Sequence, residues 1–180
     1  MSHALIIGGS GMLKGTSIWL ASQYDYVTVI GRSKKKMDSL INQCHNIKPL
    51  YLDYHDTTHL KFEIEEQVRK LGNPDLIVAW VHSTAPNALF TIINVVSKQL
   101  HNWRLVHILG SSSNLEMIKK NVLVPENCTY SQVQLGFVRE NNIARWLTNT
   151  EISFGVNKAI SQKEANFIVG TLEPWEQRPS

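Results

Sequence analysis

The chain has 180 residues, a length typical of a single domain. Hydrophobic residues make up 43% of it and charged residues 18%, which excludes a disordered or coiled-coil protein. The formal charge of +3 is too small to indicate a nucleic-acid partner, and no apolar stretch is long enough to span a membrane. Its 2 cysteines form neither a disulfide framework nor a metal-binding motif. We therefore expect one cytoplasmic domain over residues 1–180, without nucleic acid, membrane or metal.

Short apolar runs alternate with helical patterns from the start of the chain to about residue 110. The predicted strands are residues 4–7, 26–30, 49–52, 76–81 and 104–109. Helices are predicted after the first glycines and over residues 36–46, 60–71 and 86–96, where apolar residues such as Met37, Leu40, Ile41 and Cys44 share one face. This alternation predicts an α/β fold, a doubly wound Rossmann-like parallel sheet of order 3-2-1-4-5-6 with helices on both faces in three layers.

Beyond residue 110 the pattern is weaker. Residues 113–121 fit a short helix, and residues 130–138 read as a longer strand. Thr148 and Glu151 have the spacing of a capping box, which predicts a helix that runs to about Ile160. A last short strand is expected over residues 166–172, followed by an irregular tail.

The most informative motif is the run Gly8-Gly9-Ser10-Gly11-Met12, which follows the first predicted strand and opens the first helix, with Gly15 beyond it. A dinucleotide needs such a turn, because its pyrophosphate approaches backbone that a β-carbon would block and meets free N–H groups at a helix N-terminus. We therefore expect residues 8–12 to bind a dinucleotide cofactor. The alternative is a glycine-rich turn without a ligand.

The end of the second strand predicts which cofactor binds. An NAD site usually places an acidic residue there for the ribose 2′-hydroxyl, whereas this strand ends in Gly31-Arg32-Ser33. The guanidinium of Arg32 suits a 2′-phosphate, Ser33 adds a hydroxyl, and the basic run that ends at Lys36 follows in the first helical turn. We therefore predict NADP(H) rather than NAD, bound by Arg32, Ser33 and Lys36. Alternatively, the lysines form a solvated helix face.

Over about residues 4–112 the chain resembles the short-chain dehydrogenase/reductase superfamily. The resemblance is carried by the first strand and glycine turn, by Leu52-Asp53-Tyr54, and by Leu109-Gly110-Ser111-Ser112-Ser113. It implies that Asp53, with Tyr54 beside it, contacts the adenine and that Ser111 lies where the family has its catalytic serine. A homodimer would be usual for such a family. Lys14 stands where the extended branch places its third glycine, which here follows one position later at Gly15.

Two departures from the family concern the chemistry. After the fourth strand, Trp80-Val81-His82-Ser83-Thr84 replaces an Asn-Asn-Ala-Gly-like segment. The family's Tyr-x-x-x-Lys motif is absent, and the nearest match, Tyr130 to Gln134, has a neutral amide in place of the lysine. Because an amide cannot lower the pKa of a tyrosine by charge, the family's usual mechanism does not transfer.

The remaining candidates for proton delivery are His82, Ser111 and Tyr130. His82 and Ser83 follow the fourth strand and should face the nicotinamide half of the cofactor, where they either act in catalysis or bind ribose and cap the next helix. The serines from Ser111 onward either orient a carbonyl or cap a short helix, and Tyr130 either donates a proton or packs in the sheet.

The sequence thus favours an NADP-dependent oxidoreductase of atypical short-chain type, which transfers hydride between NADPH and a small carbonyl or imine substrate. Loss of the Tyr/Lys pair supports an alternative, a non-catalytic NADP(H)-binding sensor or regulatory protein. A third possibility is a structural Rossmann protein that binds no nucleotide.

Overall fold

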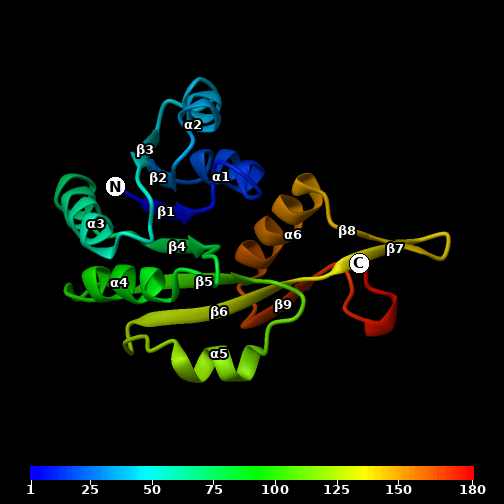
Figure 1. Cartoon of the computed structure of the whole chain (residues 1–180). Helices are drawn as coiled ribbons and strands as arrows, with labels where there is room; N and C mark the ends of the chain where they lie inside the picture. Colours follow the sequence, from blue (N-terminus) through cyan, green and yellow to red (C-terminus); the bar gives the residue numbers. More distant parts are fainter.

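The computed structural model describes all residues from Met1 to Ser180. Its main sheet has seven strands, all parallel, in the order β3-β2-β1-β4-β5-β6-β9 (Figure 1). The predicted α/β class and strand order are confirmed, and β9 extends the sheet beyond β6. The strands are β1 His3–Ile7, β2 Tyr26–Gly31, β3 Ile47–Tyr51, β4 Leu76–Ala79, β5 Trp103–Leu109, β6 Cys128–Leu135 and β9 Asn166–Val169.

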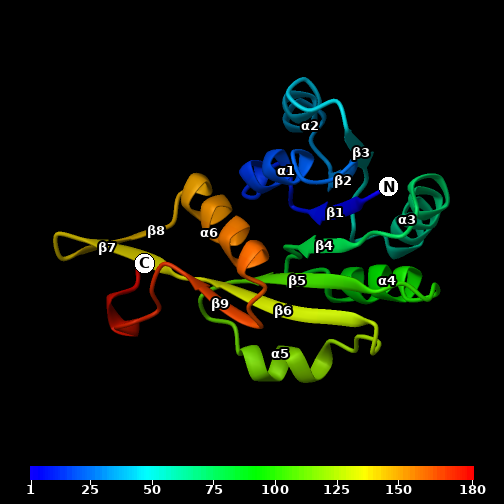
Figure 2. The ribbon, with the colours of Figure 1, turned by 180° about the vertical axis from the view of Figure 1, so that it is seen from behind.

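Helices cover both faces of the sheet and complete three layers (Figures 1 and 2). One face carries α1 Lys14–Ala21, α2 Lys34–Ile41 and α6 Asn149–Gln162; the other carries α3 Thr57–Leu71, α4 Pro86–Val96 and α5 Leu115–Asn121. Strand β1 shows why both faces are buried, because Ala4 and Ile6 pack into one apolar cluster while Leu5 and Ile7 pack into the other.

The expected long strand over residues 130–138 was wrong in one respect, since it divides at Gly136 into β6 and β7 Phe137–Glu140. A β-carbon on Gly136 would collide with the carbonyl oxygen of Thr171, so only glycine allows this close crossing. Strand β7 then pairs antiparallel with β8 Ile143–Trp146 through a turn in which Asn141 and Asn142 both have positive φ. The resulting hairpin projects from the sheet beside the C-terminal tail (Figure 1), which contains the short 3-10 helix Trp175–Gln177.

Helix α2 is shorter than expected and ends at Ile41, so that Cys44 packs against the core from the following turn. The capping box at Thr148 is confirmed: its hydroxyl accepts from the N–H of Glu151, whose carboxylate accepts from the N–H of Thr148. Helix α6 lies against α1, and a β-carbon on Gly15 would come within 2.8 Å of Ser153. The C-terminal part of the chain therefore supports the helix that follows the glycine turn.

None of the helices combines the length and the apolar composition that crossing a membrane requires.

Candidate functional site

The glycine turn lies at the carboxyl end of β1, and the surroundings of its glycines differ. Gly8 has a φ of +83°, a conformation that favours glycine, and lies against the side chain of Trp80. A β-carbon on Gly9 would come within 2.8 Å of Ile6 and would collide with the hydroxyl of Ser17. Gly11, in contrast, has no atom within 4 Å of the position of a β-carbon. The fold therefore requires Gly9, whereas Gly11 borders open space.

Unused backbone donors surround that open space. Helix α1 has no side-chain cap, because its first flanking residue is Leu13. The hydrogen bonds of the turn run from the N–H groups of Gly11 and Leu13 to the carbonyl of Gly8, and those of Ser10 and Met12 find no acceptor in the chain. Free N–H groups at a helix N-terminus beside a space that a β-carbon would fill fit the pyrophosphate of a dinucleotide.

At the end of β2 the side chain of Arg32 is 72% exposed, and its guanidinium lies 3.6 Å from the carboxylate of Asp53. The hydroxyl of Ser33 accepts from the N–H of Lys36 at 3.4 Å and so caps α2, while the Lys36 side chain is exposed. Because an exposed ion pair is weak, Arg32 can reorient toward a ligand, as can the exposed side chain of Lys36. Ser33 therefore has a structural role as the cap of α2, whereas the sequence predicted only that it binds the cofactor.

A chain of polar side chains joins the ends of β3 and β4. The carboxylate of Asp53 lies 2.6 Å from Nδ1 of His55, Nε2 of His55 lies 2.9 Å from the hydroxyl of Thr84, and that hydroxyl lies 3.1 Å from Nδ1 of His82. The main-chain N–H and imidazole of His55 keep the pKa of Asp53 below its ordinary value. The N–H of His82 also donates to the hydroxyl of Tyr54 at 3.3 Å. His82 is thus held from two sides, although it is exposed.

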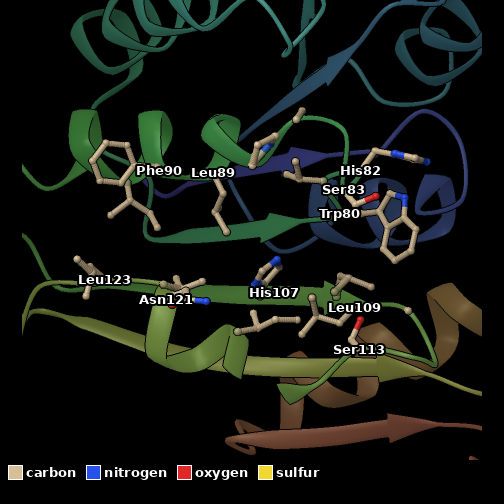
Figure 3. A pocket seen from close by; sticks show the side chains of 18 of the residues that line it. Trp80, His82, Ser83, Leu89, Phe90, His107, Leu109, Ser113, Asn121 and Leu123 are labelled. Carbon is tan, nitrogen blue, oxygen red and sulfur yellow. The ribbon is translucent and has the colours of Figure 1, made fainter. Parts of the chain in front are cut away.

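A cavity of about 530 Å³ opens beside His82 and lies between α4, the segment that follows β4, the carboxyl half of β5, and α5. Figure 3 shows it running along the sheet from Trp80, His82 and Ser113 at one end to Phe90 and Leu123 at the other, with His107 between. Most of the lining is hydrophobic, and its volume lies in the range of small-molecule sites. The predicted residues His82 and Ser83 therefore border this cavity.

The loop after β5 is held by Gln134. Its side-chain amide donates to the carbonyl oxygens of Gly110, Ser111 and Ser113 at 3.3, 3.0 and 3.0 Å. Ser112 and Ser113 line the cavity, whereas Ser111 does not, and Asn114 rather than any of the serines caps α5. The structure therefore places Ser111 at the predicted edge but turns its neighbours toward the cavity.

Tyr130 lies away from this edge. It is paired with Leu105, near the amino end of β5, and its hydroxyl lies 3.0 Å from Nδ1 of His107. Because a strand rises about 3.3 Å per residue, Tyr130 and Gln134 lie roughly 13 Å apart, whereas a helical Tyr-x-x-x-Lys pair lies on adjacent turns. The structure thus separates Tyr130 from His82 and Ser111, and those two remain the candidates for proton delivery at the edge.

The structure places His107, a buried residue of β5, in the cavity wall. Burial lowers its pKa to about 4 and raises the pKa of Tyr130 to about 12, so both are neutral at pH 7. The available signal was the face that Leu105, His107 and Leu109 share in a strand, which placed a polar residue between two apolar ones. No group of histidine, cysteine and acidic side chains is arranged to hold a metal ion.

No family model and no curated protein matches the sequence. Solved structures do resemble it. A short-chain dehydrogenase from Streptomyces avermitilis has a TM-score of 0.72 at 11% identity and covers 94% of this chain and 88% of its own. A short-chain dehydrogenase/reductase from Serratia marcescens gives 0.71 at 15%, covering 94% and 96%. A glucose/ribitol dehydrogenase of this type from Brucella melitensis gives 0.70 at 8%, covering 94% of each chain. At these identities the likeness establishes the fold, and the chain has the Rossmann fold of short-chain dehydrogenases/reductases.

Proposed function

We propose that the protein is an NADP-dependent oxidoreductase of atypical short-chain type, acting on a small carbonyl or imine substrate. The observation that carries the proposal is the open space at Gly11, bordered by unused backbone N–H groups at the N-terminus of α1. The oxidoreductases that share the fold support it. When bound, NADPH supplies the hydride, and the protein's contribution is to position it and to exclude competing reactions.

The residues of the turn and the strand ends divide the remaining work. The N–H groups of Ser10 and Met12 would hold the pyrophosphate, and Arg32 would hold the 2′-phosphate. Asp53 and Tyr54 would contact the adenine, and Ser83 the ribose. His82, fixed through Thr84 and Tyr54 at the mouth of the cavity, would hold or deliver a proton to the substrate.

Titration of the protein with NADPH and with NADH, followed by fluorescence, tests the cofactor assignment. NADPH should bind more tightly, and Arg32→Ala should weaken NADPH by about 1.5–3 kcal/mol, the range for hydrogen bonds to charged groups, while NADH changes little. Lys48→Ala, which removes a cation of β3 that lies over the ring of Tyr26, is the matched control. Equal weakening of both nucleotides in Arg32→Ala would contradict the 2′-phosphate assignment.

A second candidate is a non-catalytic NADP(H)-binding sensor, and the position of Gln134 favours it. The amide that stands in place of the family's lysine is committed to three loop carbonyls and has no contact with a catalytic tyrosine. A screen of carbonyl substrates separates the two candidates. An enzyme should turn over at least one of them and lose turnover in His82→Ala without losing NADPH affinity, whereas a sensor should turn over none.

A further inference from the structure

A single imidazole interrupts the apolar part of the cavity between α4 and α5. His107 projects from β5, is 7% exposed, and lies among lining residues of which 11 of 19 are hydrophobic. Leu89 of α4 and Asn121 of α5 lie nearest to it in Figure 3 among the labelled residues of these helices, and Phe90 of α4 lies toward the far end of the cavity. A polar group in such surroundings destabilises the fold unless something hydrogen-bonds to it, so its two nitrogens need partners.

Only one of the two nitrogens has a partner in the chain. Nδ1 lies 3.0 Å from the hydroxyl of Tyr130, and no residue hydrogen-bonds Nε2. Nε2 is not completely buried, and His107 lines the cavity, so this nitrogen can be reached from the cavity. The structure therefore presents Nε2 of His107 to a molecule inside the cavity as an unpaired polar atom of the sheet, with the side chain of Asn121 on the α5 side.

The tautomer of His107 follows from the tyrosine. Burial raises the pKa of Tyr130 to about 12, so its phenol keeps the proton. The hydroxyl lies 3.0 Å from Nδ1, and the side chain of Gln132 hydrogen-bonds to its oxygen as a donor, which lowers that pKa in part. Nδ1 therefore accepts, and a neutral imidazole then carries its hydrogen on Nε2. The group that faces the cavity is a hydrogen-bond donor.

We propose that His107 is a substrate-binding residue whose Nε2–H donates to a carbonyl oxygen of an apolar molecule held between α4 and α5, with Tyr130 as the residue that fixes the tautomer. This identifies the substrate class and, in treating the molecule as a substrate, rests on the proposed function. His107 precedes Gly110 by three residues, which is roughly 10 Å of strand inward from the edge where hydride would be transferred. The carbonyl oxygen that His107 binds therefore holds the substrate inside the cavity and is not the group that reacts.

The test uses two aromatic probes of similar shape, acetonaphthone, which has a carbonyl, and ethylnaphthalene, which has none. Their dissociation constants are measured calorimetrically without cofactor for the wild type and for His107→Leu. Because the ratio of the two constants is compared between proteins, differences in the hydration of the free probes cancel. His107→Leu should weaken acetonaphthone about five- to tenfold, as expected for one neutral hydrogen bond, and should not weaken ethylnaphthalene.

Tyr130→Phe keeps the imidazole and tests the positioning role. Without the phenol the His107 ring should populate both tautomers, visible in proton–nitrogen NMR spectra of the imidazole, and acetonaphthone should bind about two- to threefold more weakly, because only part of the population then donates. Tyr51→Phe and His45→Leu, which alter exposed side chains outside the cavity, are the matched controls and should change neither probe.

The inference is overturned if the wild type binds neither probe, or if the ratio is the same in the wild type and in His107→Leu. An unchanged His107 spectrum in Tyr130→Phe would overturn the role of the tyrosine alone. NADPH titration of His107→Leu should match the wild type, so failure of the cavity assignment is distinguishable from failure of the cofactor assignment. Retained unfolding temperatures for the variants show that the changes are local.

Discussion

The two halves of the carboxyl edge are built on different principles. Around β1 to β3 the candidate cofactor site consists mainly of backbone, namely the glycine turn and the uncapped N-terminus of α1. Around β4 to β6 the cavity consists of side chains, mostly apolar, and its polar groups include His82, His107, Asn121 and the serine loop. The first half suits a ligand whose charge and shape are constant, because backbone groups are enough to bind it. In the second half the side chains that line the cavity determine which ligand fits.

This difference explains why the resemblance to short-chain dehydrogenases covers the two halves unequally. A pyrophosphate requires glycine and free N–H groups, so that half retains a recognisable pattern. In the other half a helical Tyr-x-x-x-Lys is replaced by strand β6 and the seven-residue helix α5, and Gln134 supports a loop. The predictions below test each half separately, so that an effect on the wrong half would contradict the division.

The largest expected effect is that of Gly11→Val. The side chain would occupy the space that we propose for the pyrophosphate and would remove about two charge-assisted hydrogen bonds of about 1.5–3 kcal/mol each, so NADPH affinity should fall more than about a hundredfold. The unfolding temperature should stay close to that of the wild type, because no atom lies within 4 Å of the new β-carbon. Gly9→Val is the contrasting variant and should lower the unfolding temperature, since it collides with Ile6 and Ser17. Unchanged NADPH binding in Gly11→Val would refute the turn assignment.

In the side-chain half, His107 should make stability depend on pH. Its pKa in the folded protein is about 4 against an ordinary value of 6.5, so between these values the unfolded chain binds more protons and stability falls as the pH falls. From pH 7 to about 4.5, before most carboxylates titrate, the contribution lost is about 2–3 kcal/mol. His3, whose pKa burial also lowers, adds to the same trend.

Urea unfolding of the wild type and of His107→Leu at several pH values measures this contribution. The variant should show a shallower decline, because the His107 contribution is absent while that of His3 remains. His45→Leu, which changes an exposed histidine, should decline as the wild type does. Parallel curves for His107→Leu and the wild type would mean that the imidazole is not buried in the neutral form.

The loop after β5 should depend on Gln134. Gln134→Leu is close in size but leaves three carbonyl oxygens without their amide donor, so we expect a loss of about 1–3 kcal/mol in the free energy of unfolding. Hydrogen exchange should quicken at Ser111 to Ser113, while NADPH affinity changes little, since the glycine turn lies in the other half. A variant that lost NADPH binding with an intact loop would show that Gln134 contacts the cofactor instead.

The sequence predicted the sheet order and the glycine turn because both follow from local patterns, namely alternating periodicities and glycines after an apolar run. The break at Gly136 was missed, since it depends on contact with Thr171, which is far along the chain. The Asn141-Asn142 turn was a local signal that the strand reading overlooked. The partners of Tyr130 and Gln134 were not predictable from spacing, because they depend on how β6 pairs with β5 and on the loop that follows β5.

Thr148→Ala tests a link between the halves with the smallest expected effect. The hydroxyl caps α6, which begins after the projecting hairpin and packs against α1 beside the glycine turn. Losing a threonine cap typically costs about 1 kcal/mol, so the free energy of unfolding in urea should fall by about that amount. Arg145 still pairs with Glu151, so α6 should remain in place and the NADPH dissociation constant should not change. Thr150→Ala, which changes an exposed threonine two residues further along, is the control. A fall in NADPH affinity specific to Thr148→Ala would mean that α6 does more than support the turn, because it would then set the position of the N–H groups that we propose for the pyrophosphate.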